Sequence, residues 1–317
     1  MREYCLAVDI GGTKIMYGLF DDKHEIIYRM RTLTPKDVTQ QELTDKIHRE
    51  VMDILDKNQL TLENIRGIGM GMPSYVDHER GVVVTSGSMY NIKNYPAKQL
   101  FTERFPGVDV LIDNDTNLAA LAEHRLGAGR GHKNMIYTAL STGIGSGFII
   151  NNELFRGTYG GAGESGHMLV TPGDGVLCGC GNQGCIMSYA SGTMIMKHIC
   201  HAIENGEPTL MKDMEDDINK LSTVHLLKAY QMGDALAVRM IEQMVHYIAI
   251  YIYNLFISFN IGCFVCGGGL TNMGDFFMDK IRQKVALFNK QENQEIDIKV
   301  AELGGDNGII GAAMLFE

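Results

Sequence analysis

Two similar glycine-rich segments stand out in the sequence, VDIGGTKIMYGLF at residues 8–20 and ALSTGIGSGFII at residues 139–150. In each, an apolar run with β-branched residues predicts a strand, a Gly/Thr turn follows, and a second apolar run predicts the returning strand. In the second copy the returning strand is expected at residues 148–150. Two copies of one hairpin, each at the head of a lobe, predict two similar α/β lobes that face each other across a cleft.

The remaining apolar patterns alternate between strands and helices along the chain, as in α/β proteins. Strands are expected at residues 25–32, 65–72, 108–112, 135–140, 263–266 and 296–302. Helices are expected at residues 39–58, 117–126 and 307–316. The chain is also expected to be mostly helical from the end of the segment at residues 157–191 to residue 259, with breaks at 205–208 and 232–234.

One apolar stretch, at residues 244–269, is long enough to suggest a membrane span. His246, Asn254 and Asn260 interrupt it, and its end resembles a separate strand. We therefore predict a buried helix followed by a buried strand. Cys263 and Cys266 in that strand have C-x-x-C spacing, but they lack a partner pair and are interpreted as packing residues.

Composition limits the class of protein. The chain has 317 residues, 45% of them hydrophobic and 21% charged, which suits a soluble globular protein with two sizeable cores. The net charge of −10 argues against nucleic acid and anionic membranes as partners. Seven cysteines, without a recognisable signal segment, favour a cytoplasmic protein whose thiols are metal ligands or buried residues.

The segment GTYGGAGESGHMLVTPGDGVLCGCGNQGCIMSYAS, at residues 157–191, contains His167, Cys178, Cys180 and Cys185. One histidine and three cysteines form a complete ligand set for a closed tetrahedral Zn²⁺ site. A closed site has no open position for a substrate, so the zinc is predicted to be structural and to hold the loop in place. The alternative is three reduced thiols on a glycine-rich surface loop.

The two glycine-rich turns can bring backbone N–H groups close to phosphate oxygens, because glycine has no Cβ. Asp9, at the end of the first strand, could hold hydrated Mg²⁺, or it could be an ordinary strand-end carboxylate in solvent. The chain lacks the P-loop pattern, and a strand rather than a helix follows its second turn. The predicted phosphate-binding residues are Gly11, Gly12, Thr13, Lys14, Thr142 and Gly143.

Asp113, Asn114 and Asp115 follow a predicted strand, at the sheet edge where α/β proteins place their chemistry. A carboxylate there could accept the proton of an attacking hydroxyl, or it could cap the helix that follows. Taken alone, the sequence positions of Glu164 and His167 do not decide between a functional and a structural role. Together with Asn114 and Asp115 they supply the polar groups that a polyhydroxylated substrate needs.

With these motifs the sequence resembles the ROK family of bacterial sugar kinases over essentially its whole length. The family signature fits L-S-T-G-I-G-S-G-F at residues 140–148, the glycine at 157 and G-x-x-G-H at 163–167, and the family's zinc motif fits CGCGNQGC at 178–185. D-I-G-G-T-K at 9–14, G-M-P at 71–73, D-N-D-T-N at 113–117, G-G-G at 267–269 and G-I-I-G-A-A at 308–313 also match.

The resemblance implies an actin-like, hexokinase-type (ribonuclease H-like) two-lobe ATPase fold with a central cleft. It implies ATP-dependent phosphorylation of a hexose hydroxyl, with Asp115 as the catalytic base. Asn114, Glu164 and His167 would bind the sugar, and His167 would also ligate zinc. Asn91 aligns loosely with a sugar-contacting asparagine, although Tyr90 replaces the proline that usually precedes it. Gly267, Gly268 and Gly269 would lie near the adenosine.

One residue departs from the family pattern. After the third cysteine the family usually has C-x-E, whose glutamate binds the sugar near its C1 and C2 hydroxyls, whereas this chain has Met187. Methionine is a weak acceptor, so a modified or epimeric hexose becomes a candidate beside glucose.

The resemblance also carries expectations for the molecule as a whole. We expect a smaller lobe at residues 1–117 plus 305–317, a larger lobe at 118–304 that carries the zinc loop, and a homo-oligomer, either a dimer or a tetramer. Some family members are repressors with an N-terminal helix-turn-helix, for which the hairpin at residue 4 leaves no room. The alternative to a kinase is a non-catalytic sugar-sensing regulator on the same scaffold, and four protein ligands argue against a catalytic zinc.

Overall fold

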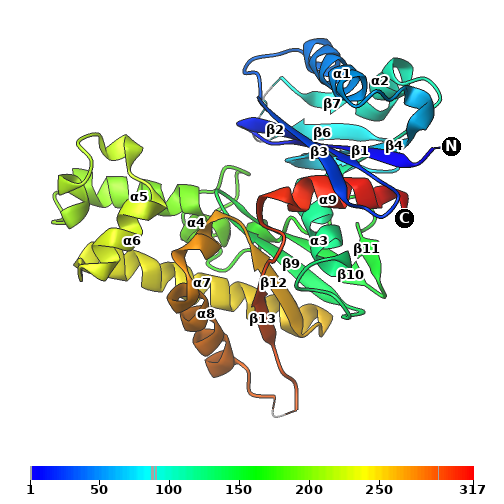
Figure 1. Ribbon diagram of the computed structural model, residues 1–317. Helices are drawn as coiled ribbons and strands as arrows, with labels where there is room; N and C mark the ends of the chain where they lie inside the picture. The colour runs from blue at the N-terminus through cyan, green and yellow to red at the C-terminus, as the bar shows by residue number, and fades with distance from the viewer. Residues whose placement is uncertain (1, 87–88, 90, 292) are drawn as a thin grey trace. The chain divides into compact units, whose positions relative to one another are not determined.

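The computed structural model describes residues 2–86, 89, 91–291 and 293–317 (Figure 1). Its contacts divide the chain into two compact units, and each unit is assembled from separate stretches of sequence. Unit 1 comprises Met1–Lys133, Gly147–Gly163 and Glu302–Glu317, and unit 2 comprises Asn134–Ser146 and Glu164–Ala301. The lobe boundaries expected at residues 117/118 and 304/305 stay a prediction.

The main sheet of unit 1 has five strands in the order β3-β2-β1-β4-β8. β1 pairs antiparallel with β2, and β1, β4 and β8 run parallel. The expected hairpin at residues 8–20 is confirmed, with the glycine-rich turn between β1 and β2. The strands are β1 (Tyr4–Ile10), β2 (Lys14–Phe20), β3 (Ile26–Leu33), β4 (Ile65–Met72) and β8 (Asp109–Asn114).

Helices cover both faces of this sheet. Successive residues of a strand point to opposite sides, so alternate residues of β1 contact different helices. Leu6 and Val8 of β1 belong to the core formed with α1 and α2, whereas Cys5 and Ala7 pack with α3 and α9. Asp9 continues the second series and so points to the α3/α9 side. The helices are α1 (Gln40–Lys57), α2 (Ala97–Arg104), α3 (Asp115–Arg125) and α9 (Asn307–Ala313).

A small three-stranded antiparallel sheet, β5-β6-β7, was not predicted from the sequence. Val83 and Tyr95 from this sheet are fully buried in the core that includes α1 and α2. The sheet therefore extends the first core of unit 1 and does not form a separate one. Its strands are β5 (Ser74–Asp77), β6 (Val82–Ser86) and β7 (Lys93–Tyr95).

The second five-stranded sheet has the order β11-β10-β9-β12-β13. The prediction that the second hairpin returns only at residue 148 was wrong, because β10 already begins at Ile144. Gly147 lies inside that strand, where an added Cβ would be 2.8 Å from the Thr116 carbonyl oxygen, so the close approach of α3 requires glycine. The strands are β9 (Met135–Leu140), β10 (Ile144–Ile150), β11 (Glu153–Phe155), β12 (Cys263–Gly267) and β13 (Asp297–Val300).

Unit 2 is otherwise mostly helical, as expected. Gly233, with φ of +80°, and Asp234, which caps α7 by accepting from the Ala237 N–H at 2.8 Å, explain the predicted break before α7. The helices are α4 (Met187–Ala190), α5 (Gly192–Glu204), α6 (Thr223–Gln231), α7 (Ala235–Phe259) and α8 (Asp275–Phe288).

Helix α7 and strand β12 are the predicted helix and strand of the long apolar stretch. By length and composition α7 could cross a membrane, but 56% of its most apolar window is buried inside the protein. It packs against α4, α5, α6 and α8. This environment is that of a core helix.

Candidate active site

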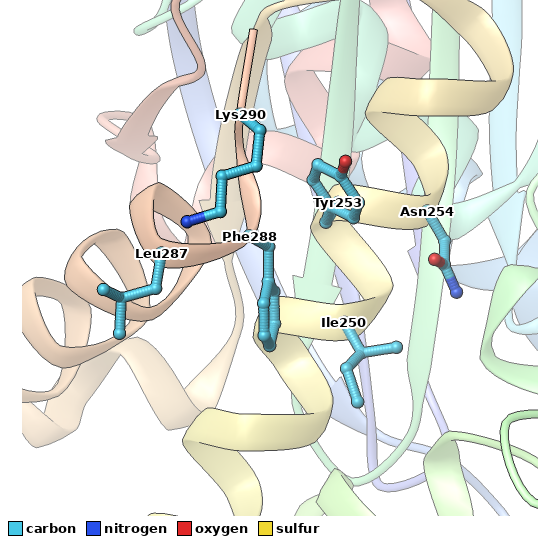
Figure 2. Close-up of a pocket in the computed structure, with 6 residues that line it drawn as sticks. All are labelled: Ile250, Tyr253, Asn254, Leu287, Phe288 and Lys290. Atoms are coloured by element: carbon cyan, nitrogen blue, oxygen red, sulfur yellow. The ribbon is translucent and has the colours of Figure 1, made fainter.

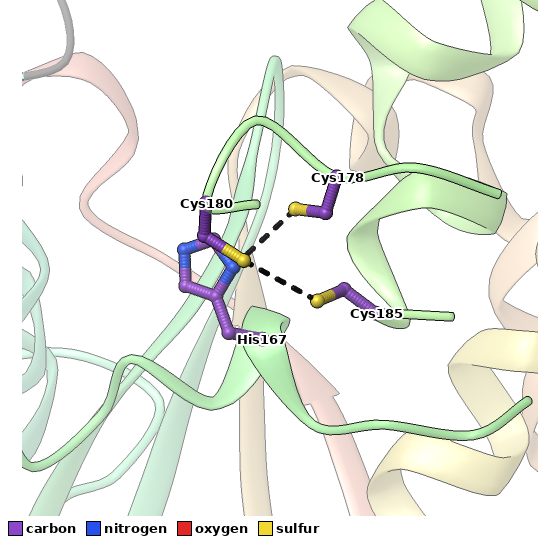
Figure 3. A group of neighbouring side chains, drawn as sticks. All are labelled: His167, Cys178, Cys180 and Cys185. Atoms are coloured by element: carbon purple, nitrogen blue, oxygen red, sulfur yellow. Dashed lines mark hydrogen bonds between the residues drawn. The ribbon is translucent and has the colours of Figure 1, made fainter. Parts of the chain in front are cut away.

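Four side chains of types that can ligate a metal gather in unit 2 (Figure 3), namely those of His167, Cys178, Cys180 and Cys185. Their ligand atoms all lie within 4.8 Å of one another. The Sγ atom of Cys178 is 3.5 Å from Nδ1 of His167, and the Sγ atoms of Cys180 and Cys185 are 3.6 Å apart. The structure thus brings together the ligand set that the sequence predicted.

The loop reverses tightly around this cluster with the help of two glycines. Gly181 and Gly184 have φ of +93° and +85°, which is the region that favours glycine. At Gly184 an added Cβ would also lie 2.1 Å from the Thr171 carbonyl oxygen. A hydrogen bond of 2.8 Å from the Cys178 N–H to the Asn182 carbonyl closes the turn.

These distances fit a zinc ion. A tetrahedral centre with Zn–S bonds of about 2.3 Å places neighbouring ligand atoms roughly 3.8 Å apart. Burial raises the pKa of the Cys185 thiol to about 12, and the hydrogen bonds that its S–H donates to Cys180 and Cys178 add to the effect, so a bound cation is needed to keep it ionised near neutral pH. His167 faces the cysteines with Nδ1, and its Nε2 lies 4.0 Å from Oε2 of Glu164.

Asp9 lies at the carboxyl end of β1 in unit 1, enclosed by two glycines. An added Cβ at Gly308 would be 2.4 Å from Oδ2 of Asp9, and one at Gly71 would be 3.2 Å from Oδ1. Desolvation raises the pKa of Asp9 to about 6, and the charge of Lys14 opposes the rise in part. Asp9 is therefore a partly desolvated carboxylate rather than an ordinary one in solvent.

The turn beside Asp9 is tight and open to solvent at its tip. The Gly11 N–H donates to the Lys14 carbonyl at 2.9 Å, and the Thr34 hydroxyl donates to the Gly11 carbonyl at 2.6 Å. Gly12 and Thr13 at the tip are exposed. The backbone of the turn is thus held from inside while its tip can meet a ligand.

Two adjacent polar residues, Asn114 and Asp115, lie where β8 ends and α3 begins. Asn114 is the N-cap of α3, since its side chain accepts from the Thr116 N–H at 2.8 Å. Asp115 is the first helical residue, and the position of an added Cβ at Gly71 lies 3.9 Å from its Cα. Gly71 is thus flanked by Asp9 on one side and by Asp115 on the other.

Asp113 is a buried carboxylate whose partner the sequence did not reveal. Its Oδ2 accepts from Nε of Arg156 at 2.7 Å, and its Oδ1 accepts from the Asn114 N–H and the Asn117 side chain, each at 2.8 Å. The Nδ1 atom of His78 lies 3.5 Å away. Asp113 is only 1% exposed, so these donors satisfy a carboxylate that water cannot reach.

The second glycine-rich turn lies in unit 2 against the triple glycine. An added Cβ at Gly268 would be 2.5 Å from the Leu140 carbonyl oxygen, and the Gly192 N–H donates to the Ser141 carbonyl at 2.8 Å. Thr142 at the tip is exposed. The terminal methyl group of Met187 is 3.4 Å from where a Cβ of Gly143 would be, so Met187 lies beside this turn.

The other predicted sugar contacts are exposed to solvent. The Glu164 side chain is 52% exposed and directly precedes the short 3₁₀ turn Ser165–His167. Asn91 is exposed in a turn of unit 1, and Tyr90 beside it lies outside the described residues. Asp9, Asn114 and Asp115 belong to unit 1, whereas Glu164, His167, Thr142 and Gly267–Gly269 belong to unit 2.

Known proteins match this chain over nearly its full length. The ROK family profile matches residues 5–317. A glucokinase of Streptomyces coelicolor is 32% identical over 315 residues, which cover 98% of this chain and 96% of that protein. The structure of a ROK family glucokinase from Streptomyces griseus, in complex with glucose and AMPPNP, superposes with a TM-score of 0.80 at 32% identity over 98% of each chain.

A ROK hexokinase from Thermus thermophilus superposes with a TM-score of 0.84 at 28% identity, over 98% of this chain and 97% of that one. The fold is therefore the α/β, actin-like, hexokinase-type ATPase fold that the sequence predicted. Within that class, the chain belongs to the ROK family.

Proposed function

We propose that the protein is an ATP-dependent sugar kinase that transfers the γ-phosphoryl group of ATP to the 6-hydroxyl of a hexose. The observation that carries the proposal is the placement of Asp9 and Asp115 on either side of Gly71, at the carboxyl ends of parallel strands. One carboxylate is suited to a metal-bound phosphate and the other to a substrate hydroxyl. The full-length similarity to glucokinases supports the same activity.

In the proposed reaction Asp115 acts as the general base. It accepts the proton of the sugar hydroxyl as that oxygen forms a bond to the γ-phosphorus, while the bond from that phosphorus to the bridging oxygen of ADP breaks. Asn114 is the N-cap of α3, and Oδ1 of Asp115 also accepts from the Thr116 N–H at 2.8 Å, which holds the Asp115 carboxylate at the start of the helix.

The sugar would be bound by carboxylate, amide and imidazole side chains. Carboxylate and amide groups can fix several hydroxyls at once through paired hydrogen bonds. Asn91, Asn114, Glu164 and His167 would supply these groups. Met187 would contact the sugar as an apolar neighbour, so a glucose with a modified or inverted centre near C1 or C2 is a candidate substrate beside glucose itself.

The nucleotide would be held by backbone and hydroxyl groups. The residues assigned to it are Gly11, Gly12, Thr13, Lys14, Thr142, Gly143, Gly267, Gly268 and Gly269. Asp9 would hold hydrated Mg²⁺, which supplies charge neutralisation on the phosphates. The Cys₃His cluster would hold a structural Zn²⁺ that fixes the loop bearing Glu164 and His167. A homo-oligomer in the cytoplasm, with neither nucleic acid nor membrane as partner, stays a prediction.

A coupled assay of ADP release tests the proposal, with a panel of aldohexoses, N-acetylhexosamines and 2-ketohexoses. Asp115→Asn should lower kcat by about 10²–10⁴-fold, because a positioned base is lost while sugar binding remains. Asp109→Asn is the matched control, since Asp109 lies exposed at the other end of β8 and should keep full activity. Sugar binding without ADP release from any member of the panel would favour the sugar-sensing regulator instead.

A further inference from the structure

Helix α7 sends one tyrosine into a buried cluster of hydroxyl groups in unit 2. The Tyr251 side chain has no exposed surface. Its hydroxyl is hydrogen-bonded to the hydroxyl of Ser146 in β10 and, at 2.7 Å, to that of Ser165. A single phenol oxygen thus joins a strand of the sheet to the turn that follows Glu164.

That turn carries two of the residues assigned to the sugar. Ser165 lies between Glu164 and His167, and the His167 N–H donates to the Glu164 carbonyl at 3.1 Å, which closes the turn. At Gly166 an added Cβ would be 2.1 Å from the Ile144 carbonyl oxygen, so the turn lies directly on β10. The contact at Gly166 sets how far the turn is from the strand, and the Tyr251 bridge restricts how it can slide or rotate there.

We propose that Tyr251 is a positioning residue for the sugar, which it serves by holding the Glu164–His167 turn against β10 through Ser165. The inference rests on the proposed sugar kinase function. Burial raises the pKa of Tyr251 to about 12, so its hydroxyl keeps its proton near neutral pH and can donate one hydrogen bond while accepting the other. Strand β10 is fixed by its sheet, and loss of the bridge therefore frees the turn rather than the strand.

The same helix offers a matched control. Tyr253 lies two residues further along α7 and lines a surface pocket of about 310 Å³ with Phe288, Leu287, Ile250, Asn254 and Lys290 (Figure 2). Its ring centroid is 6.0 Å from that of Phe288. Tyr253→Phe therefore makes the same chemical change on a different face of the helix, away from the hydroxyl cluster.

The test compares Tyr251→Phe, Ser165→Ala and Tyr253→Phe with the wild type. We expect Tyr251→Phe and Ser165→Ala each to raise the KM for the sugar about tenfold, equivalent to about 1.4 kcal/mol. The kcat and the KM for ATP should stay within about twofold of the wild-type values. The variants weaken contacts to the sugar equally in the ground state and in the transition state, and they do not touch the ATP site. The double variant should be no worse than either single one, since both remove the same bridge. Tyr253→Phe should match the wild type.

Zinc content and sugar affinity separate this role from a merely structural one. Both variants should retain the zinc content of the wild type, and the dissociation constant of the sugar measured by calorimetry without ATP should rise as KM does. An unchanged sugar affinity, with only a lower Tm, would show that Tyr251 fills the core and nothing more. Loss of zinc would assign the effect to the metal loop and also overturn the inference. A wild type that binds sugar but does not phosphorylate it contradicts the proposed function alone, because the calorimetric comparison still tests the positioning role.

Discussion

Asp9 illustrates how a side chain that we assign to the nucleotide site can be unfavourable for folding. Its pKa rises from a usual value of 3.8 to about 6, chiefly through desolvation. Between these values the folded protein binds the proton more tightly than the unfolded chain does, so its stability falls as the pH rises through this window. Above pH 6 the whole unfavourable contribution is present, and below about pH 4 it is absent.

We therefore expect Asp9→Asn to be more stable than the wild type at pH 7 in metal-free buffer, by as much as about 3 kcal/mol. The gain should shrink as the pH falls from 6 towards 4. Urea unfolding at several pH values measures it, and the same variant should lose kinase activity. A gain that does not depend on pH would show that the Asp9 charge is not its source.

Met187 carries the prediction about specificity. Its methyl group lies beside Gly143, where a glutamate would place an acceptor instead. A sugar hydroxyl that lacks such an acceptor costs about 1–3 kcal/mol unless water replaces it. Met187→Glu should therefore raise kcat/KM for free glucose about tenfold relative to the native sugar, whereas Met187→Leu should leave the ratio unchanged. If the wild type already prefers glucose and the glutamate brings no gain, another residue makes this contact.

Single residues also mark the limit of what the sequence could predict. The Cys₃His cluster could be predicted because its four residues lie within nineteen positions and belong to metal-ligating types. The Asp113–Arg156 pair was not, because its members are 43 residues apart and no motif with a known spacing connects them. Tyr251 was hidden for another reason: inside an apolar helix a tyrosine looks like any other core residue.

Among the loops, the zinc segment should behave as one cooperative element. Cys180→Ser removes the most exposed of the three thiolate ligands, so zinc occupancy should fall and the sugar KM should rise with it. Cys200→Ser is the control, because that half-buried cysteine lies outside the cluster. Metal analysis and kinetics on the same preparations check the link. Full activity in a zinc-free sample would refute it.

Strands and helices were predictable where their pattern was unbroken. β4 and β9 have the predicted bounds because each consists of apolar residues and glycine, with Arg66 and Thr138 as the exceptions. The start of β10 was missed because its glycines suggested a loop, whereas Gly147 allows the close packing of α3 against the strand. The small sheet was missed because strands such as Lys93–Tyr95 are short and mostly polar, and only their contacts with the core make them regular.

For the chain as a whole, the division into units predicts the effect of truncation. Helix α9 fills one face of the main sheet with Ile309, Ala312 and Ala313, all nearly or fully buried. A chain that ends at residue 301 should therefore lose cooperative unfolding, as seen by circular dichroism during heating. A chain that lacks only Glu317 should lose less than about 1 kcal/mol, because its contacts are ion pairs with partly exposed His24 and Arg125. Cooperative unfolding of the shorter chain would contradict the prediction.

The interleaved segments of unit 1 also affect how the protein is made. Residues 302–317 belong to unit 1 but follow all of unit 2 in the sequence. They therefore leave the ribosome after the rest of unit 1 and after the whole of unit 2. Synthesis proceeds at about 5–20 residues per second, so on the order of 10–30 seconds pass between the synthesis of residue 163 and that of residue 317. Throughout this interval the face of β1 that bears Cys5 and Ala7 lacks α9, one of the two helices that cover it. The nascent chain is therefore a natural client for a chaperone that shields apolar surface during translation.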